Sequence, residues 1–323
     1  MTKESLRIVY MGTPDFAVES LRCLVEGGYN VVGVVTGPDK AVGRHGSVLQ
    51  PTPVKQYAVD HGLRVLQPEK LKDESFIEEL RSLQADLQIV VAFRMLPEVV
   101  WSMPPLGTFN LHASLLPQYR GAAPINWAVI NGDTETGVTT FFLKHEIDTG
   151  AVIRQVRVPI SDTDCVGDVH DRLMSLGGSV VCETVDAIID GSAEATPQEM
   201  MMTDEELRPA PKIFKDTCRI DWNRPVKQVY DFIRGLSPYP AAWTTLVAPD
   251  GTETVLKIYE AEKLSAAQPC PTGTIETDGK SYLCVHAGDG LLSIRSLQLA
   301  GKKRMGVGDF LRGFRIDKGY SVK

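Results

Sequence analysis

The sequence predicts an α/β fold: a doubly wound, mostly parallel sheet domain followed by a smaller β-barrel domain. Short apolar segments alternate with amphipathic helical patterns up to about residue 190, which is typical of a parallel sheet covered on both faces. A stretch with prolines and no clean periodicity follows at 191–212. Beyond residue 241, short alternating runs are separated by glycine-containing turns, and this spacing favours a small barrel.

The first elements show the alternation clearly. Residues 6–12 read as a buried strand, and a helix is predicted to follow at once. Thr13 can cap this helix, Pro14 suits its first position, and Gly27 and Gly28 suit its end. Further strands are predicted at 30–35, 64–67, 85–93, 107–114, 136–144 and 151–160, and further helices at 54–62, 72–84, 123–132, 162–191 (with a possible interruption at 177–178) and 224–236.

Composition restricts the class of protein. The chain has 323 residues, 43% of them hydrophobic and 23% charged, which is typical of a globular protein with a large core. No apolar run approaches the roughly 20 residues of a membrane-spanning helix. Six scattered cysteines without a CxxC pair favour reduced thiols in a cytoplasmic protein and argue against a cysteine-based metal site.

Charge is distributed unevenly along the chain. The formal net charge is −7, but residues 207–323 contain 18 lysines and arginines against 12 aspartates and glutamates. The last third is therefore basic, whereas the rest is strongly acidic. A basic module attached to an acidic domain is typical of proteins that bind a polyanion.

The segment GTFNLHASLLPQYRGAAPINWA, at 107–128, contains the candidate catalytic residues. Asn110 and His112 lie two apart at the end of a predicted strand, so their side chains should face one side together. An amide can donate a hydrogen bond to an oxyanion, and an imidazole can transfer a proton near neutral pH. Asp148, in IDTG, is the candidate third partner. The set suits acyl transfer without a side-chain nucleophile, although a structural histidine and a turn-forming aspartate are the alternatives.

Two nucleotide-binding motifs are missing. No G-x-G-x-x-G follows the first strand, and GxxxxGK[ST] does not occur. The pattern therefore disfavours a dinucleotide-binding enzyme and a P-loop NTPase.

Residues 109–153, FNLHASLLPQYRGAAPINWAVINGDTETGVTTFFLKHEIDTGAVI, resemble the core signature of the folate-dependent formyltransferases, with N-x-H-x-S-L-L-P and a later D-x-G. MGTPDFAV near the start, and RIDW, PYPAAW and GDGLLSIRSLQLAGKKRM in the last third, resemble the members of that family that act on a charged tRNA. The resemblance implies transfer of the formyl group of 10-formyltetrahydrofolate, a co-substrate, to methionyl initiator tRNA, without a metal.

The same resemblance implies the site and the domains. Asn110 falls on the oxyanion-contacting amide, His112 on the catalytic imidazole and Asp148 on the catalytic carboxylate. A folate-binding segment is implied at Ser114, Leu115, Leu116 and Pro117. The implied domains are a catalytic domain at 1–191, a linker at 192–210 and an OB-like tRNA-binding domain at 211–323, in a monomer.

Two further segments bear on the resemblance. The polar loop at 36–53, with Lys40 and Arg44, matches a family insertion that contacts tRNA, and Lys302, Lys303 and Arg304 would contact phosphates. AFRMLP, at 92–97, is one residue shorter than the A-Y-G-x-x-L-P of the family's folate-side loop. The core motif alone also fits a nucleotide-sugar amine formyltransferase, and a catalytically inactive tRNA-binding protein is the non-enzymatic alternative.

Overall fold

The computed structural model describes residues 1–43, 47–268 and 270–323. Arg44, expected to contact tRNA, therefore lies outside the described residues. The chain forms two compact units, and both are discontinuous in sequence: residues 1–121, 136–158 and 170–209 make the first, and residues 122–135, 159–169 and 210–323 make the second.

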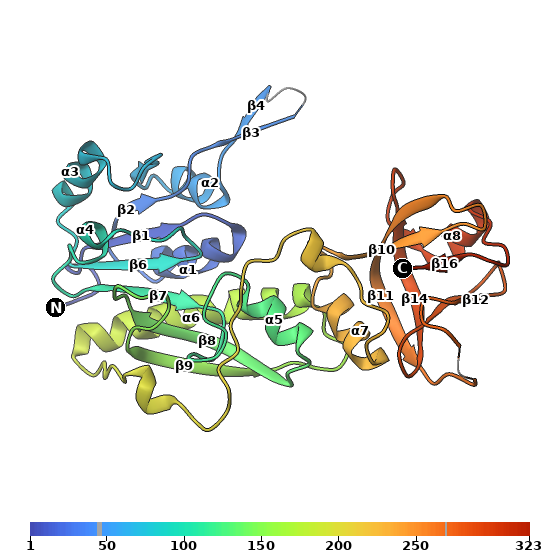
Figure 1. Ribbon diagram of the computed structural model, residues 1–323. Helices are drawn as coiled ribbons and strands as arrows, with labels where there is room; N and C mark the ends of the chain where they lie inside the picture. Colours follow the sequence, from blue (N-terminus) through green and yellow to red (C-terminus); the bar gives the residue numbers. More distant parts are fainter. Residues whose placement is uncertain (44–46, 269) are drawn as a thin grey trace. The chain divides into compact units, whose positions relative to one another are not determined.

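The first unit is built on a seven-stranded sheet, and Figure 1 shows its strands side by side. The pairs of the first five strands are parallel, and β8 then joins β7 in the antiparallel direction. The expected mostly parallel sheet is confirmed. In spatial order the strands are β5 (Val65–Leu66), β2 (Val31–Val35), β1 (Ile8–Gly12), β6 (Leu87–Val91), β7 (Thr108–His112), β8 (Glu135–Phe142) and β9 (Val152–Pro159).

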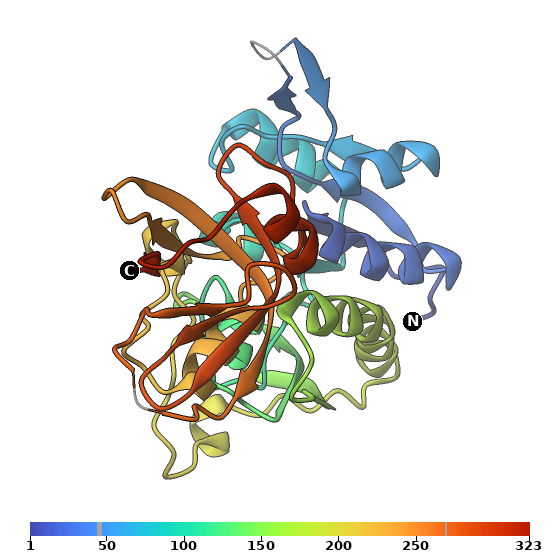
Figure 2. The same cartoon turned by 90° about the vertical axis from the view of Figure 1, so that its right-hand side faces the viewer.

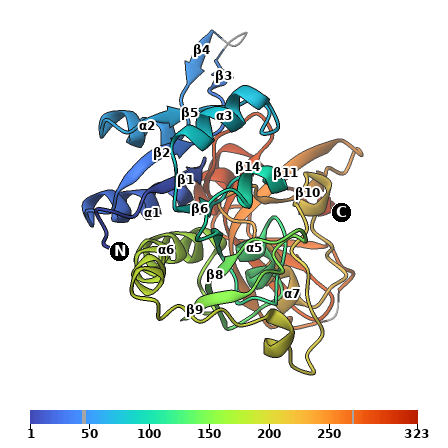
Figure 3. The same ribbon diagram turned by 90° about the vertical axis from the view of Figure 1, so that its left-hand side faces the viewer.

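Helices cover both faces of this sheet, as side-chain alternation along β1 requires. Val9 and Met11 pack in one core cluster with α3 (Glu74–Ser82) and α4 (Glu98–Trp101). Tyr10 points to the opposite face, where its hydroxyl donates to the Ala17 carbonyl of α1 (Asp15–Glu26). Figure 3 shows α1 and α6 (Val166–Asp190) along one side of the sheet. The shorter helix α2 (Pro53–Asp60) packs on α1.

Two local predictions about helices are wrong. The helix α1 has Pro14 as its N-cap without a side-chain cap, because the Thr13 hydroxyl instead accepts from the Gly37 amide. The helix α6 runs without interruption through Gly177 and Gly178. A Cβ atom at Gly177 would lie 2.6 Å from a Leu111 side-chain carbon of β7, so this glycine serves close packing rather than a helix break.

The polar segment at 36–53 is more regular than a loop. It contains a small antiparallel pair, β3 (Lys40–Val42) and β4 (Val48–Gln50), with Lys40 opposite Gln50. Val48 and Leu49 are 56% and 69% exposed. A two-stranded ribbon therefore presents apolar side chains together with the exposed Lys40.

The second unit is a nearly closed antiparallel barrel, which confirms the predicted second architecture (Figure 2). An isolated bridge between Thr274 and Ser321 links the two ends of the strand order. The barrel surrounds its own core, which includes Trp222 and Ile294. Its strands are β12 (Ile275–Thr277), β13 (Leu283–His286), β14 (Leu291–Leu299), β11 (Glu253–Leu264), β10 (Ala242–Val247) and β16 (Ser321–Val322), with β15 (Met305–Gly306) beside β14.

The described residues of the second unit form three α-helices. They are α5 (Pro124–Ile130), α7 (Val226–Arg234) and α8 (Val307–Gly313). Among the described residues, all six cysteines are free thiols, as expected. No helix in the described part of the chain is long and apolar enough to span a membrane.

Candidate functional site

The candidate site lies in the first unit, at the end of β7. Asn110 stands opposite Phe141 and His112 opposite Thr139 of β8, so the two side chains lie two residues apart on one strand. Asn110 is half-buried and its amide makes no hydrogen bond to another described residue. This amide is thus available to a bound group.

The His112 ring has a defined hydrogen-bonding arrangement. It is 7% exposed, and its Nε2 lies 2.8 Å from the Tyr119 carbonyl oxygen. A carbonyl only accepts, so Nε2 carries the proton in this bond, and Nδ1 is the basic nitrogen of the neutral ring. The role of Tyr119 was missed by sequence reasoning, because a backbone carbonyl gives no residue-type signal.

Asp148 faces the basic nitrogen of this ring. Its Oδ2 lies 3.9 Å from His112 Nδ1 and accepts a 2.9 Å hydrogen bond from the Gly121 amide. Asp148 has a φ of 55°, a left-handed conformation that aspartate tolerates better than most residues. The structure therefore brings Asn110 and His112 onto one strand and places Asp148 beside His112.

Glycine is required two residues after Asp148. A Cβ atom on Gly150 would lie 1.6 Å from the Phe142 carbonyl oxygen, a distance that no side chain can adopt. The D-x-G turn therefore fits against the end of β8 only with glycine at this position.

The predicted folate-binding segment forms a largely buried loop after β7. Ser114, Leu116 and Pro117 are buried and Leu115 is half-buried. The Ser114 hydroxyl donates to the Gln118 carbonyl at 2.7 Å, and Leu116 packs against Phe141 and Val152. The side chains of Ser114 and Leu116 thus hold the loop itself, and the part of all four residues in folate binding stays a prediction.

The shortened segment at 92–97 is also held in place. Ala92 has a positive φ of 46°, and the Arg94 guanidinium donates to the carbonyl oxygens of Pro68 and Glu69. The same guanidinium lies 5.5 Å from the centre of the Phe93 ring. Arg94 therefore ties this loop to the segment that follows β5.

The basic residues of the barrel differ in their availability. Arg304 donates to Glu260 and to the Ser296 hydroxyl, so a carboxylate offsets its charge. Lys302 and Lys303 are exposed between β14 and β15, and their ammonium groups make no ion pair with a described residue. These two lysines are the better candidates for phosphate contacts.

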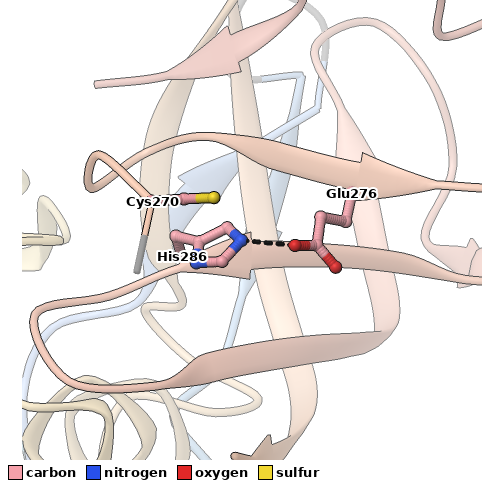
Figure 4. Close-up of side chains that lie close together, drawn as sticks. All are labelled: Cys270, Glu276 and His286. Carbon is pink, nitrogen blue, oxygen red and sulfur yellow. Dashed lines mark hydrogen bonds and ion pairs between the residues drawn. The ribbon is translucent and has the colours of Figure 1, made fainter. Parts of the chain in front are cut away.

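One group of side chains in the barrel has donor types that suit a metal. Figure 4 shows Cys270, Glu276 and His286 close together, with their ligand atoms within 4.8 Å of one another. The His286 Nε2 already forms a 2.6 Å hydrogen bond with Glu276 Oε1. Since this pairing gives a ring nitrogen of the buried His286 a carboxylate partner, we interpret the group as a buried histidine held by a carboxylate.

The second unit also contains a pocket of about 430 Å³. It is lined by residues of α5 and α7 and by the chain at 217–224, with Arg219, Arg224 and Asp221 among its polar groups. Asn110, His112 and Asp148 do not line it. We therefore do not identify this pocket with the acyl-transfer chemistry.

Comparison with known proteins identifies the class. Residues 6–185 match the family model described as formyl transferase, and residues 212–315 match the formyl transferase C-terminal domain. The chain therefore belongs to the formyl transferase family. It is 72% identical to a methionyl-tRNA formyltransferase of Parabacteroides distasonis over 100% of both chains, and 73% identical to one of Phocaeicola vulgatus, also over 100% of both.

A solved structure supports the fold independently. The chain resembles an N-formyltransferase from Helicobacter canadensis, in complex with folinic acid and dTDP-3-aminofucose, with a TM-score of 0.63. The match covers 93% of this chain and 100% of that chain at 18% identity. At this identity the likeness concerns the fold.

Proposed function

We propose that this chain transfers the formyl group of 10-formyltetrahydrofolate to the α-amino group of methionyl initiator tRNA. The full-length identity with proteins named methionyl-tRNA formyltransferase carries the proposal. The product, formylmethionyl-tRNA, serves translation initiation, and we propose a cytoplasmic monomer. We also keep the functional division proposed from the sequence, with catalysis at 1–191 and tRNA binding at 211–323, joined by the segment at 192–210.

The proposed chemistry begins with the neutral methionine amine, which attacks the formyl carbon. A tetrahedral intermediate forms, with negative charge on the former carbonyl oxygen and positive charge on the attacking nitrogen. The Asn110 amide donates to this oxygen, and the half-buried position of that amide supports the role. The His112 Nε2–H is already bonded to Tyr119, which leaves Asn110 as the side-chain donor to the oxyanion.

Proton transfer completes the reaction. His112 Nδ1 accepts the proton that the attacking nitrogen loses, and the Asp148 carboxylate 3.9 Å away stabilises the imidazolium. The bond between the formyl carbon and N10 breaks, and the His112 imidazolium gives the proton that it accepted to N10 as tetrahydrofolate leaves. Formylmethionyl-tRNA and tetrahydrofolate are the two products.

The test is a single-turnover formylation assay with three acceptors: methionyl initiator tRNA, methionyl elongator tRNA and a nucleotide-linked amino sugar. We expect transfer to the initiator tRNA. Transfer to the sugar alone would instead identify a nucleotide-sugar amine formyltransferase. Binding of tRNA and folate without any transfer would identify an inactive binding protein.

Substitutions test the assignment of roles. Asn110→Ala should lower the transfer rate constant by about 10²–10³-fold, because an oxyanion donor is removed. His112→Ala should also lower it strongly, whereas His61→Ala, at an exposed position after α2, should keep the wild-type rate. A near-normal rate for folded Asn110→Ala would contradict the proposed oxyanion contact.

A further inference from the structure

The segment expected to be a mere linker contacts the candidate site. Its start joins β9, because Thr196 and Val152 exchange two 2.8 Å backbone hydrogen bonds. Its later part holds the loop after β7: the Tyr119 amide donates to the Arg208 carbonyl, and the Arg208 amide donates to the Gln118 side chain. The segment at 196–208 is thus a structural part of the first unit.

Gln198 is the buried residue of this segment. It begins the 3₁₀ turn η2 (Gln198–Met201) and is 0% exposed. Its Nε2 donates to the carbonyl oxygens of Asp148 at 2.8 Å and Gly150 at 2.9 Å. Its Oε1 accepts from Nη2 of Arg120 at 2.7 Å and from its Nε at 3.0 Å.

These four bonds join two separate parts of the site. One end of the Gln198 amide holds the backbone of the D-x-G turn. The other end holds Arg120, the neighbour of Gly121, whose amide donates to the Asp148 carboxylate. The backbone and the carboxylate of Asp148 are therefore both fixed by groups that meet at Gln198.

We propose that Gln198 is a positioning residue for formyl transfer, which holds the Asp148 carboxylate in its place beside His112. The inference rests on the proposed function and on the proposed role of Asp148. It assigns a reaction-specific task to a residue outside the N-x-H and D-x-G motifs.

The chemistry of the position selects glutamine. The side chain must donate two hydrogen bonds at one end and accept two at the other, which a primary amide does. Glutamate has the same shape and can still accept from Arg120, but its carboxylate cannot donate to the Asp148 and Gly150 carbonyls. Gln198→Glu therefore removes one half of the connection and places a carboxylate against two carbonyl oxygens.

The experiment is a kinetic double-mutant cycle with Gln198→Glu and Asp148→Asn, measured as single-turnover formylation of methionyl initiator tRNA. We expect Gln198→Glu to lower the rate constant by about 10- to 100-fold, the effect of a misplaced catalytic group. The KM values for folate and tRNA should stay within about twofold, because neither contacts Gln198 in this proposal. In the Asp148→Asn background the same substitution should have almost no further effect.

Three controls make the result interpretable. Gln84→Glu adds the same charge at an exposed position of the first unit and should behave as wild type. Circular dichroism and tRNA affinity report whether the variants are folded. If Gln198→Glu does not fold, Arg120→Lys replaces it in the cycle, because it removes the two-pronged contact to Oε1 at a half-buried site.

The outcomes separate the inference from the proposed function. An equal reduction in both backgrounds would mean that Gln198 supports the fold in general, and would overturn the inference. An active wild type with an unaffected, folded Gln198→Glu variant would also overturn it while leaving the proposed function intact. A wild type that transfers no formyl group would overturn the proposed function itself, and this inference with it.

Discussion

A buried ion pair on α7 should determine the stability of the second unit. Asp231 and Arg234 have side chains only 5% and 7% exposed, and Arg234 Nε lies 2.8 Å from Asp231 Oδ1. The guanidinium also donates from Nη1 to the Ser161 and Asp164 carbonyls. Lys227, which is 52% exposed, donates to the other Asp231 oxygen at 2.6 Å. Asp231→Ala would therefore leave one buried and one exposed cation without their carboxylate.

The free energy of unfolding that Asp231→Ala should lose follows from its two partners, Arg234 and Lys227. Removing one member of a buried pair costs about 3–5 kcal/mol, whereas an exposed pair contributes about 0–1 kcal/mol. The two carbonyl contacts of Arg234 survive in Asp231→Ala, so we expect the lower end, about 3 kcal/mol. At an m-value of about 2 kcal/mol per molar urea, the unfolding midpoint falls by about 1.5 M. Lys227→Ala should lower it by no more than about 0.5 M.

Tryptophan fluorescence can follow this unit alone. Trp127, Trp222 and Trp243 belong to the second unit and only Trp101 to the first, so a Trp101→Phe background removes the signal of the first unit. Urea titrations of both variants in this background give the midpoints. A double variant, Asp231→Leu with Arg234→Met, should recover most of the stability, since no buried charge remains. A midpoint for Asp231→Ala as high as that for Lys227→Ala would refute the reasoning.

Two further predictions follow from exposed side chains. The double variant Lys302→Glu with Lys303→Glu should weaken tRNA binding, and it should lower the slope of log K against log salt by about 1 for each phosphate that the protein no longer neutralises. The control Lys72→Glu, at an exposed position of the first unit, should leave both the affinity and the slope unchanged. An unchanged slope for the double variant in filter-binding titrations would exclude these lysines from phosphate binding. Burial raises the pKa of the Cys182 thiol to about 12, and it also raises the pKa of Cys23, Cys165, Cys218 and Cys284. Because the Cys270 side chain is exposed to solvent, iodoacetamide at pH 7.5 should label Cys270 first, and peptide mapping that finds another cysteine modified earlier would contradict this order.

The sequence reveals those parts of the site that local patterns determine. Asn110 and His112 could be placed on one side of a strand because side chains alternate with a period of two. The mostly parallel sheet and the barrel follow from patterns of the same kind. The predicted interruption of the helix at 177–178 is wrong, because Gly177 is needed for close packing against the Leu111 side chain of β7. The predicted helix cap at Thr13 is wrong, because the Thr13 hydroxyl accepts a hydrogen bond from the Gly37 amide, which is more distant in sequence.

The part of the site that could not be predicted is made of backbone groups and distant polar contacts. Gln198 lies 78 residues from Arg120 and 50 from Asp148, in a stretch without periodicity. The hydrogen-bond partners of Gln198 cannot be inferred from the pattern of apolar residues. That pattern indicates which side chains face a core, but it does not indicate which amide donates to which carbonyl.

Thr139 shows why such polar groups are placed in an interior that apolar side chains could fill. Its hydroxyl donates to the Ser114 carbonyl at 2.6 Å and accepts from the Gln155 amide at 2.9 Å, while Gln155 also donates to the Leu116 carbonyl. Apolar replacements would fill the same volume, but they would leave the loop's carbonyls unpaired and its backbone free to shift. The Tyr119 carbonyl belongs to this loop and determines which His112 nitrogen is basic. The buried polar contacts therefore influence formyl transfer by fixing the position of the backbone. Removing one of them should lower the rate of transfer even where the first unit stays folded.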